Sequence, residues 1–144
     1  MAGLEVEAVH GAAERAGLAA GDEVVAVDGT PAQDVLDLEA AVAGGEFTLT
    51  VRRRGGELAL RVRPERGEGH GAALVGGLGT PVRRCRNECR FCFIDQLPAG
   101  LRSSLTVKDD DYRLSFLHGA FITLTNMGEP DLARVERLRL SPLF

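Results

Sequence analysis

The sequence has no tryptophan, one tyrosine and a single lysine, and aromatic residues make up only 5% of its 144 residues. No apolar run approaches the roughly 20 residues of a membrane-spanning helix. The start lacks the charged, then apolar, then small-residue order of a signal peptide. The formal net charge is −4, and neither half carries the basic surplus that nucleic-acid binding needs. We therefore expect a cytoplasmic protein that does not bind membranes, and nothing in its charge indicates nucleic acid as a partner.

Cysteine is also scarce, and its placement is uneven. The chain has three cysteines, and all of them fall in the stretch CRNECRFC, residues 85–92. An odd number of thiols spaced so closely argues against a disulfide framework. Thiols that stay reduced in the cytosol are free to hold a metal.

The first half of the chain predicts a small α+β module. Alternating apolar residues predict strands at 4–9, 22–27, 46–53 and 57–63, and short helices fit residues 12–17 and 34–43. Asp34 is the expected N-cap of the second helix, and Gly44 and Gly45 are expected to end it. Asp28-Gly29 marks a turn, and Arg54-Gly55-Gly56 marks a hairpin.

The stretch VHGAAERAGLAAGDEVVAVDGTPAQD resembles a bacterial PDZ domain in its AGL, GD and DG elements. Such domains bind an extended peptide as an added strand, which here implies a groove between residues 4–9 and 34–43. The loop that holds a peptide carboxylate normally precedes the first of these segments, and only Gly3 and Leu4 remain of it. Capture of a free C-terminus is therefore not expected. We favour a PDZ-shaped packing module that presents or covers another part of the same protein, with peptide binding as the alternative.

Three chemistries compete for the cysteines. A structural zinc site needs four ligands, and His118 is the only plausible fourth ligand downstream. The CRFC segment has the spacing of a redox dithiol, but a third thiol beside it is unusual for that role. An iron–sulfur cluster is normally held by four thiolates, so three would leave one iron without a protein ligand. An open metal position is typical of catalytic centres.

The C-x-x-x-C-x-x-C spacing, with Phe91 before the third cysteine, resembles the signature of radical S-adenosylmethionine enzymes. The resemblance implies a 4Fe-4S cluster bound by Cys85, Cys89 and Cys92. Its fourth iron would chelate the amino and carboxylate groups of S-adenosylmethionine, and an electron from the cluster would release a deoxyadenosyl radical. Phe91 and Phe93 are expected to pack against the cluster or the adenine, or else to belong to the core.

The following residues make the resemblance more specific. The elements C-x-N-x-C-x-FCFIDQLP, KDDDYRLSF, G-x-F-ITLTN and RLSPL, together with the PDZ-like segment, resemble an uncharacterised bacterial radical-SAM family. That family joins an N-terminal PDZ-like domain to the cluster loop and ends in a C-terminal domain of unknown function. The resemblance implies an electron-donor protein as a partner. The substrate, whether a small molecule or a peptide, stays unassigned.

Residues 120–126 are expected to form a buried strand. By analogy with radical-SAM barrels, Thr123, Thr125 and Asn126 would bind the amino group of the cofactor. The three acids Asp109–Asp111 fit helix capping, with a metal or substrate role as the alternative. Residues 129–140 fit a helix with Pro130 in its first turn. Other side chains near the cysteines have open roles. Arg83, Arg84, Arg86 and Arg90 either offset the cluster charge or form a solvated loop, and Asp95, Gln96 and Arg102 are pocket candidates.

The expected fold is thus an α+β PDZ-like domain followed by the start of an α/β, partial TIM-type radical-SAM barrel. The expected domains are residues 1–63 (PDZ-like), 64–71 (linker, with a solvated His70) and 72–144 (barrel), in which residues 72–78 fit a closely packed strand. A complete barrel takes roughly 200 residues or more, so we expect a fragment of a longer enzyme. The alternative function is a PDZ-like peptide-binding module with a zinc-holding Cys-rich tail.

Overall fold

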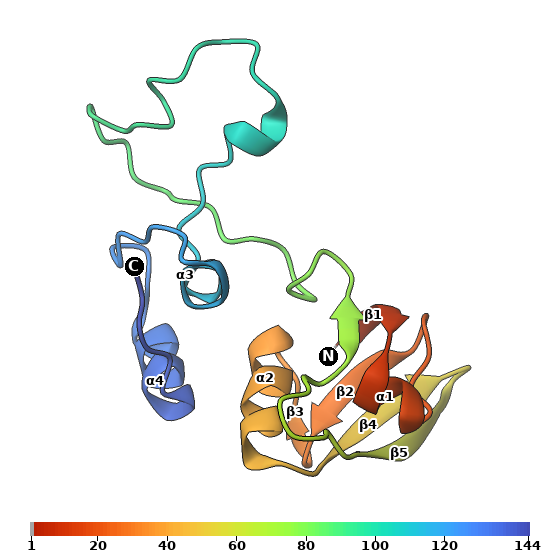
Figure 1. The fold of residues 1–144 in the computed structure, drawn as a ribbon. Coiled ribbons are helices and arrows are strands. Elements are labelled where there is room, and N and C mark those ends of the chain that lie inside the picture. Colours follow the sequence, from red (N-terminus) through yellow and green to blue (C-terminus); the bar gives the residue numbers. More distant parts are fainter. Residues whose placement is uncertain (1) are drawn as a thin grey trace. The chain divides into compact units, whose positions relative to one another are not determined.

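The computed structural model describes residues 2–144. The chain divides into two compact units, Met1–Pro81 and Val82–Phe144, which are described separately. Figure 1 shows the strands in the first unit and irregular backbone with short helices in the second. No helix among residues 2–144 is long and apolar enough to cross a bilayer.

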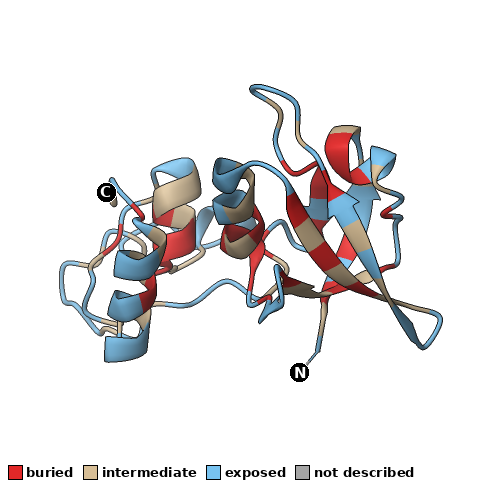
Figure 2. Cartoon of the chain, turned by 90° about the horizontal axis from the view of Figure 1, so that it is seen from below, coloured by how far each residue is buried: buried red, intermediate tan, exposed pale blue. Residues whose placement is uncertain are grey.

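Unit 1 is built on one antiparallel sheet. Its strands are β1 (Leu4–Val9), β2 (Glu23–Val27), β3 (Thr30–Pro31), β4 (Phe47–Arg53), β5 (Gly56–Val62) and β6 (Ala72–Leu74). The sheet order is β5-β4-β2-β1-β6, and β3 pairs with β2. Alternate residues of the strands face the core, so Val24, Leu49 and Val51 are almost fully buried. Figure 2 shows buried positions interspersed with more exposed ones along the strands. The four strands predicted from alternation are confirmed.

Two helices pack on this sheet, α1 (Gly11–Arg15) and α2 (Val35–Gly44). Asp34 caps α2 as predicted, because its Oδ1 accepts the amide of Leu36 at 3.0 Å. Asp37 completes a capping box by accepting the amide of Asp34. The helix ends before Gly45, whose φ of 97° lies in the region that favours glycine. Leu36 and Leu38 bury this helix against the sheet.

The segment after β5 folds back onto unit 1. Its strand β6 pairs with the edge of β1, with Leu74 opposite Val6 and Ala72 opposite Val9. The carbonyl of Leu78 accepts the amide of Val35 at the start of α2, 3.0 Å away. An added peptide strand therefore cannot pair with β1, where the sequence had placed the peptide groove, because the chain's own β6 takes that edge.

His70 is buried within this returning segment, which corrects the expectation that it is solvated. Its Nδ1 accepts the amide of Ala72 at 3.1 Å, and its Nε2 lies 3.2 Å from Oε1 of Glu39 on α2. The hydrogen bond with His70 lowers the pKa of Glu39. The many glycines of this segment are typical of a linker, and they do not reveal that His70 contacts Glu39 on α2.

Unit 2 contains the 3-10 turn η1 (Ser103–Leu105) and the helices α3 (Tyr112–His118) and α4 (Glu129–Leu138). Helix α4 has Pro130 in its first turn, as predicted. Within residues 82–144 the structure has only an isolated antiparallel bridge, between Arg84 and Asp109, and no strand. There is accordingly no closed barrel.

The prediction of a strand at residues 120–126 is wrong, and the reason is local. The side chain of Asp110 takes up the amide of Thr123 at 2.7 Å, and Leu124 has a left-handed φ of 64°. The amide of Ile122 bonds to the carbonyl of Phe144. A side chain and a single carbonyl thus replace the ladder of a neighbouring strand, and the chain turns at Leu124. Ile122 is still buried, as expected for this segment.

Candidate metal centre

The three cysteines line one cavity of about 670 Å³ in unit 2. All three thiols are free, with Cys85 and Cys92 half-buried and Cys89 exposed. The amide of Cys92 bonds to the carbonyl of Cys89, so the second and third cysteines share one tight turn. Further lining residues come from the cysteine loop and the segments after it. They are Asn87, Phe91, Phe93, Ile94, Lys108, Asp109, Phe121 and Thr123.

The base of the cysteine loop is tied to the acidic segment ahead of α3. The amide of Cys85 donates to the carbonyl of Lys108 at 2.8 Å, and the amide of Asp110 donates to the carbonyl of Arg83 at 3.0 Å. These bonds flank the Arg84–Asp109 bridge. The backbone of the first cysteine is therefore fixed from both sides.

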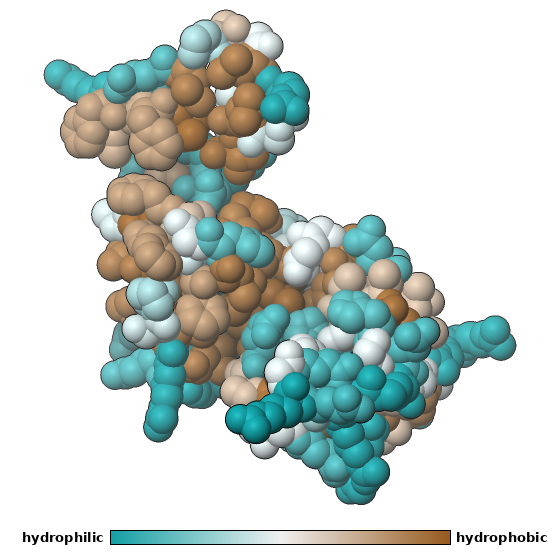
Figure 3. Space-filling view, in the orientation of Figure 1, coloured by the Kyte–Doolittle hydropathy of each residue, from teal (hydrophilic) through white to brown (hydrophobic). Residues whose placement is uncertain are grey.

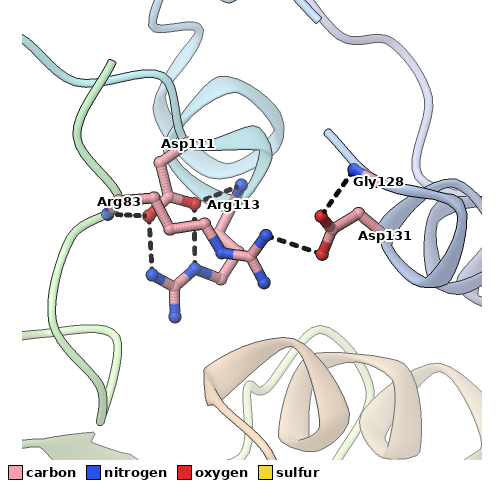
Figure 4. Close-up of polar contacts among 5 residues, drawn as sticks. All are labelled: Arg83, Asp111, Arg113, Gly128 and Asp131. Carbon is pink, nitrogen blue, oxygen red and sulfur yellow. Dashed lines mark hydrogen bonds and ion pairs between the residues drawn. The ribbon is translucent and has the colours of Figure 1, made fainter. Parts of the chain in front are cut away.

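A buried ion pair anchors this base to α3 (Figure 4). Nη2 of Arg113 lies 2.6 Å from Oδ2 of Asp111, and both side chains are almost fully buried. The same carboxylate accepts the amide of Arg83 at 2.9 Å and the amide of Arg113 at the helix start. Burial alone would raise the pKa of Asp111, but the bonds from Arg113 and Arg83 outweigh it and lower that pKa. The predicted capping role is confirmed for Asp111.

The side chain of Arg83 is not among those that line the cysteine cavity. Its guanidinium bonds to Asp131 at 2.6 Å and lies 5.0 Å above the ring of Tyr112. Asp131 also accepts the amide of Gly128, so Arg83 ties the cysteine loop to the start of α4 (Figure 4). The other arginines predicted near the cluster are exposed. Two of them, Arg84 and Arg86, line a separate cavity of about 400 Å³.

Aromatic side chains form the apolar wall of the cavity. Phe91 is 81% exposed and Phe93 63% exposed, so neither belongs to a core in unit 2. The ring of Phe93 meets that of Phe121 edge to face, with 6.3 Å between their centroids. Figure 3 shows apolar surface gathered on the loop that carries these residues. Phe121 was not among the predicted site residues, because the pattern of residues 120–126 is typical of one buried strand.

The polar residues predicted to bind the cofactor lie on one side of the first cysteine. Thr123 lines the cavity itself. The Oγ1 of Thr125 is 2.8 Å from that of Thr123 and accepts a bond from Asn87. The side-chain nitrogen of Asn126, Nδ2, lies 3.4 Å from the sulfur of Cys85. The structure therefore brings all three next to the cysteine loop.

The remaining pocket candidates are divided. Asp95 pairs with Lys108 at 2.8 Å, and this hydrogen bond lowers the pKa of Asp95 and raises that of Lys108. Gln96 and Arg102 are exposed, and neither is among the residues lining the cavity. His118, the fourth zinc ligand considered above, ends α3 and does not line it either.

Two protein-family models match the chain. A family model described as a radical SAM-like domain matches residues 65–144, and a PDZ domain model matches residues 5–53. The chain belongs to the radical SAM-like family. The family match for the second part of the chain runs to its last residue, Phe144. No curated protein matches the chain.

A radical SAM-like domain implies an iron–sulfur cluster and S-adenosylmethionine, and two features of this chain fit those groups. Three free thiols line one cavity, and its volume is in the range of roughly 300–1,000 Å³ typical of ligand sites. Asp109 lines the same cavity, and its Oδ2 is shielded from solvent and has no hydrogen-bond partner among residues 2–144. Such an acceptor suits an ammonium group. Across the same residues, no three His, Cys, Asp or Glu side chains converge tightly enough to hold a single metal ion.

Proposed function

We propose that the chain is the cofactor-binding part of a radical S-adenosylmethionine enzyme. Cys85, Cys89 and Cys92 would bind a 4Fe-4S cluster through their thiolates. The observation that carries the proposal is that all three thiols of the chain line one cavity within a matched radical SAM-like domain. When bound, the cluster supplies the electron that cleaves the cofactor.

The remaining wall of the cavity supports binding of the second cofactor. Phe91 and Phe93 are exposed and offer flat apolar faces for an adenine ring or for keeping water off the cluster. Thr123 lines this cavity, and Thr125 and Asn126 are hydrogen-bonded beside it. Asp109 adds a carboxylate oxygen that can accept a hydrogen bond from the amino group of the cofactor. The chain's share is thus to bind, orient and desolvate; the chemistry belongs to the cofactors.

The exposure of the cysteine loop bears on how a bound cluster would receive its electron. The cluster loop is on the surface of unit 2, with Cys89 exposed, which suits transfer of an electron from a donor protein. We propose a reductase or small electron carrier as that donor. The substrate, a small molecule or a peptide, would enter the same cavity.

The test is anaerobic reconstitution with iron and sulfide, followed by iron and sulfide analysis. The proposal expects about four irons per chain and a brown protein. Replacing any of the three cysteines with alanine should abolish most of the iron loading. Arg90→Ala is the matched control, since Arg90 lies between two of the ligands and carries no thiol. Colourless protein that holds zinc would instead favour a peptide-binding module with a zinc-holding tail.

A further inference from the structure

The side chain of Asn126 is bonded on both its oxygen and its nitrogen to the base of the cysteine loop. Its Oδ1 accepts the backbone amide of Arg86 at 3.1 Å. Its Nδ2 lies 3.4 Å from the sulfur of Cys85 and 2.8 Å from Oδ2 of Asp110. One amide group therefore contacts two consecutive residues of the loop, and its contact to Cys85 is made with the sulfur itself.

The neighbouring groups fix which way this amide points. The carboxylate of Asp110 only accepts hydrogen bonds, so it must face the NH₂ of Asn126. The backbone amide of Arg86 only donates, so it must face the oxygen. Both requirements give the same orientation, and it directs an N–H towards the sulfur of Cys85.

Asp110 is itself held in place and charged. It is 3% exposed, and its two oxygens accept the amide and the hydroxyl of Thr123 at 2.7 and 2.8 Å. Burial alone would raise the pKa of Asp110, but the bonds from Thr123 and Asn126 outweigh it and lower that pKa. An ionised carboxylate makes stronger hydrogen bonds than a neutral group and resists rotation of the amide that it holds.

We infer that Asn126 is a positioning residue for Cys85, held by Asp110, and that its N–H stabilises the negative charge on the bound sulfur. Hydrogen bonds to cluster sulfurs are among the factors that set the reduction potential. A donor favours the more negative, reduced cluster, so this bond raises the potential of the cluster. The inference rests on the proposed function, because it requires a cluster on Cys85.

The chain offers a direct spectroscopic test, because Asn87 and Asn126 are its only asparagines. The full chain would be labelled with ¹⁵N-asparagine, reconstituted and reduced, and the ¹⁵N coupling to the cluster measured by pulsed electron paramagnetic resonance. The expected coupling persists in Asn87→Ser and disappears in Asn126→Leu. The amide of Asn87 donates to Thr125 and not to a sulfur, which makes Asn87→Ser the matched control.

The reduction potential supplies the second readout. Asn126→Leu removes the donor and should lower the midpoint potential, and Asn126→Asp should lower it further by placing negative charge beside the sulfur. Asp110→Asn, a milder change, should weaken the ¹⁵N coupling and shift the potential in the same direction. The inference would be overturned if the labelled wild-type chain showed no ¹⁵N coupling to the cluster. It would also be overturned if Asn126 variants that load full iron kept the wild-type midpoint potential. Either result would leave the proposed function standing. A wild-type chain that takes up no cluster would overturn both.

Discussion

Leu74 lies opposite Val6 in the antiparallel pairing of β6 with β1, and both side chains are almost fully buried. Leu74 follows β5 by more than ten residues and lies outside the matched PDZ segment, residues 5–53. The sheet of unit 1 is therefore completed by a strand from the Gly-rich stretch, and the edge of β1 has no room for a peptide.

If this strand belongs to the core, Leu74→Ala should destabilise unit 1 by about 2–5 kcal/mol, the usual cost of truncating a buried leucine. Chemical denaturation followed by a probe in unit 1 measures the change. Val75→Ala is the control, because Val75 is 45% exposed and its truncation should cost less than about 0.5 kcal/mol. Equal effects of the two substitutions would mean that residues 72–75 are not packed on the sheet.

The stability of unit 1 should depend on pH through Asp22. This buried carboxylate bonds to Nε and Nη2 of Arg53 at 2.7 and 2.6 Å, and the bond with Arg53 lowers its pKa. A lowered folded-state pKa adds stability above the unfolded value of about 3.9, which is lost as the pH falls through the folded value. Asp22→Asn should therefore cost roughly 1.5–3 kcal/mol at pH 7 and much less near pH 2. A penalty that does not change between these pH values would contradict the ion pair.

The buried pair of Asp111 and Arg113 should hold unit 2 together at the base of the cysteine loop. Asp111→Asn replaces the carboxylate of this pair by a neutral amide, and removing one charge of a buried pair costs about 3–5 kcal/mol. Hydrogen exchange of the α3 amides should accelerate accordingly. Glu136→Gln, an exposed change on α4, should leave that exchange unaltered. Unchanged protection in Asp111→Asn would remove the pair from the account of how the loop is fixed.

Asp109 should contribute to cofactor affinity and not to cluster assembly. Asp109→Asn removes the charge of a shielded acceptor and should weaken S-adenosylmethionine binding by about tenfold, which corresponds to about 1.4 kcal/mol. Iron content should stay at the wild-type level. Titration of the reconstituted protein with the cofactor, followed by its absorption spectrum, measures both. Wild-type affinity in the variant would show that the acceptor serves another purpose.

Local signals were enough to predict most of unit 1. Alternation identified the four long strands, and Asp34 and Gly45 identified the ends of α2. They also indicated a closely packed strand within residues 72–78, where β6 lies, but they did not show that this strand pairs with β1 in the sheet of unit 1. Its strand character depends on the partner β1, and pairing of distant segments leaves little trace in a short stretch of sequence.

Unit 2 shows the opposite balance. The spacing of the cysteines predicted a shared loop, and the structure brings them to one cavity with Phe91 and Phe93. The path of residues 120–126 could not be predicted, because it depends on Asp110 taking up the amide of Thr123. Asp110 also accepts a hydrogen bond from Asn126, whose side chain contacts the sulfur of Cys85. This contact with a cysteine therefore comes from the segment for which a strand was wrongly predicted.

The central claim is a cluster held by three thiolates with one iron left open to the cofactor. ⁵⁷Fe Mössbauer spectroscopy of the reconstituted chain, with and without S-adenosylmethionine, tests it most directly. We predict that about a quarter of the iron signal, from the single iron without a cysteine ligand, changes when the cofactor is added. Iron sites that are all alike and indifferent to the cofactor would contradict the claim, as would a protein that holds only a tetrahedral zinc ion.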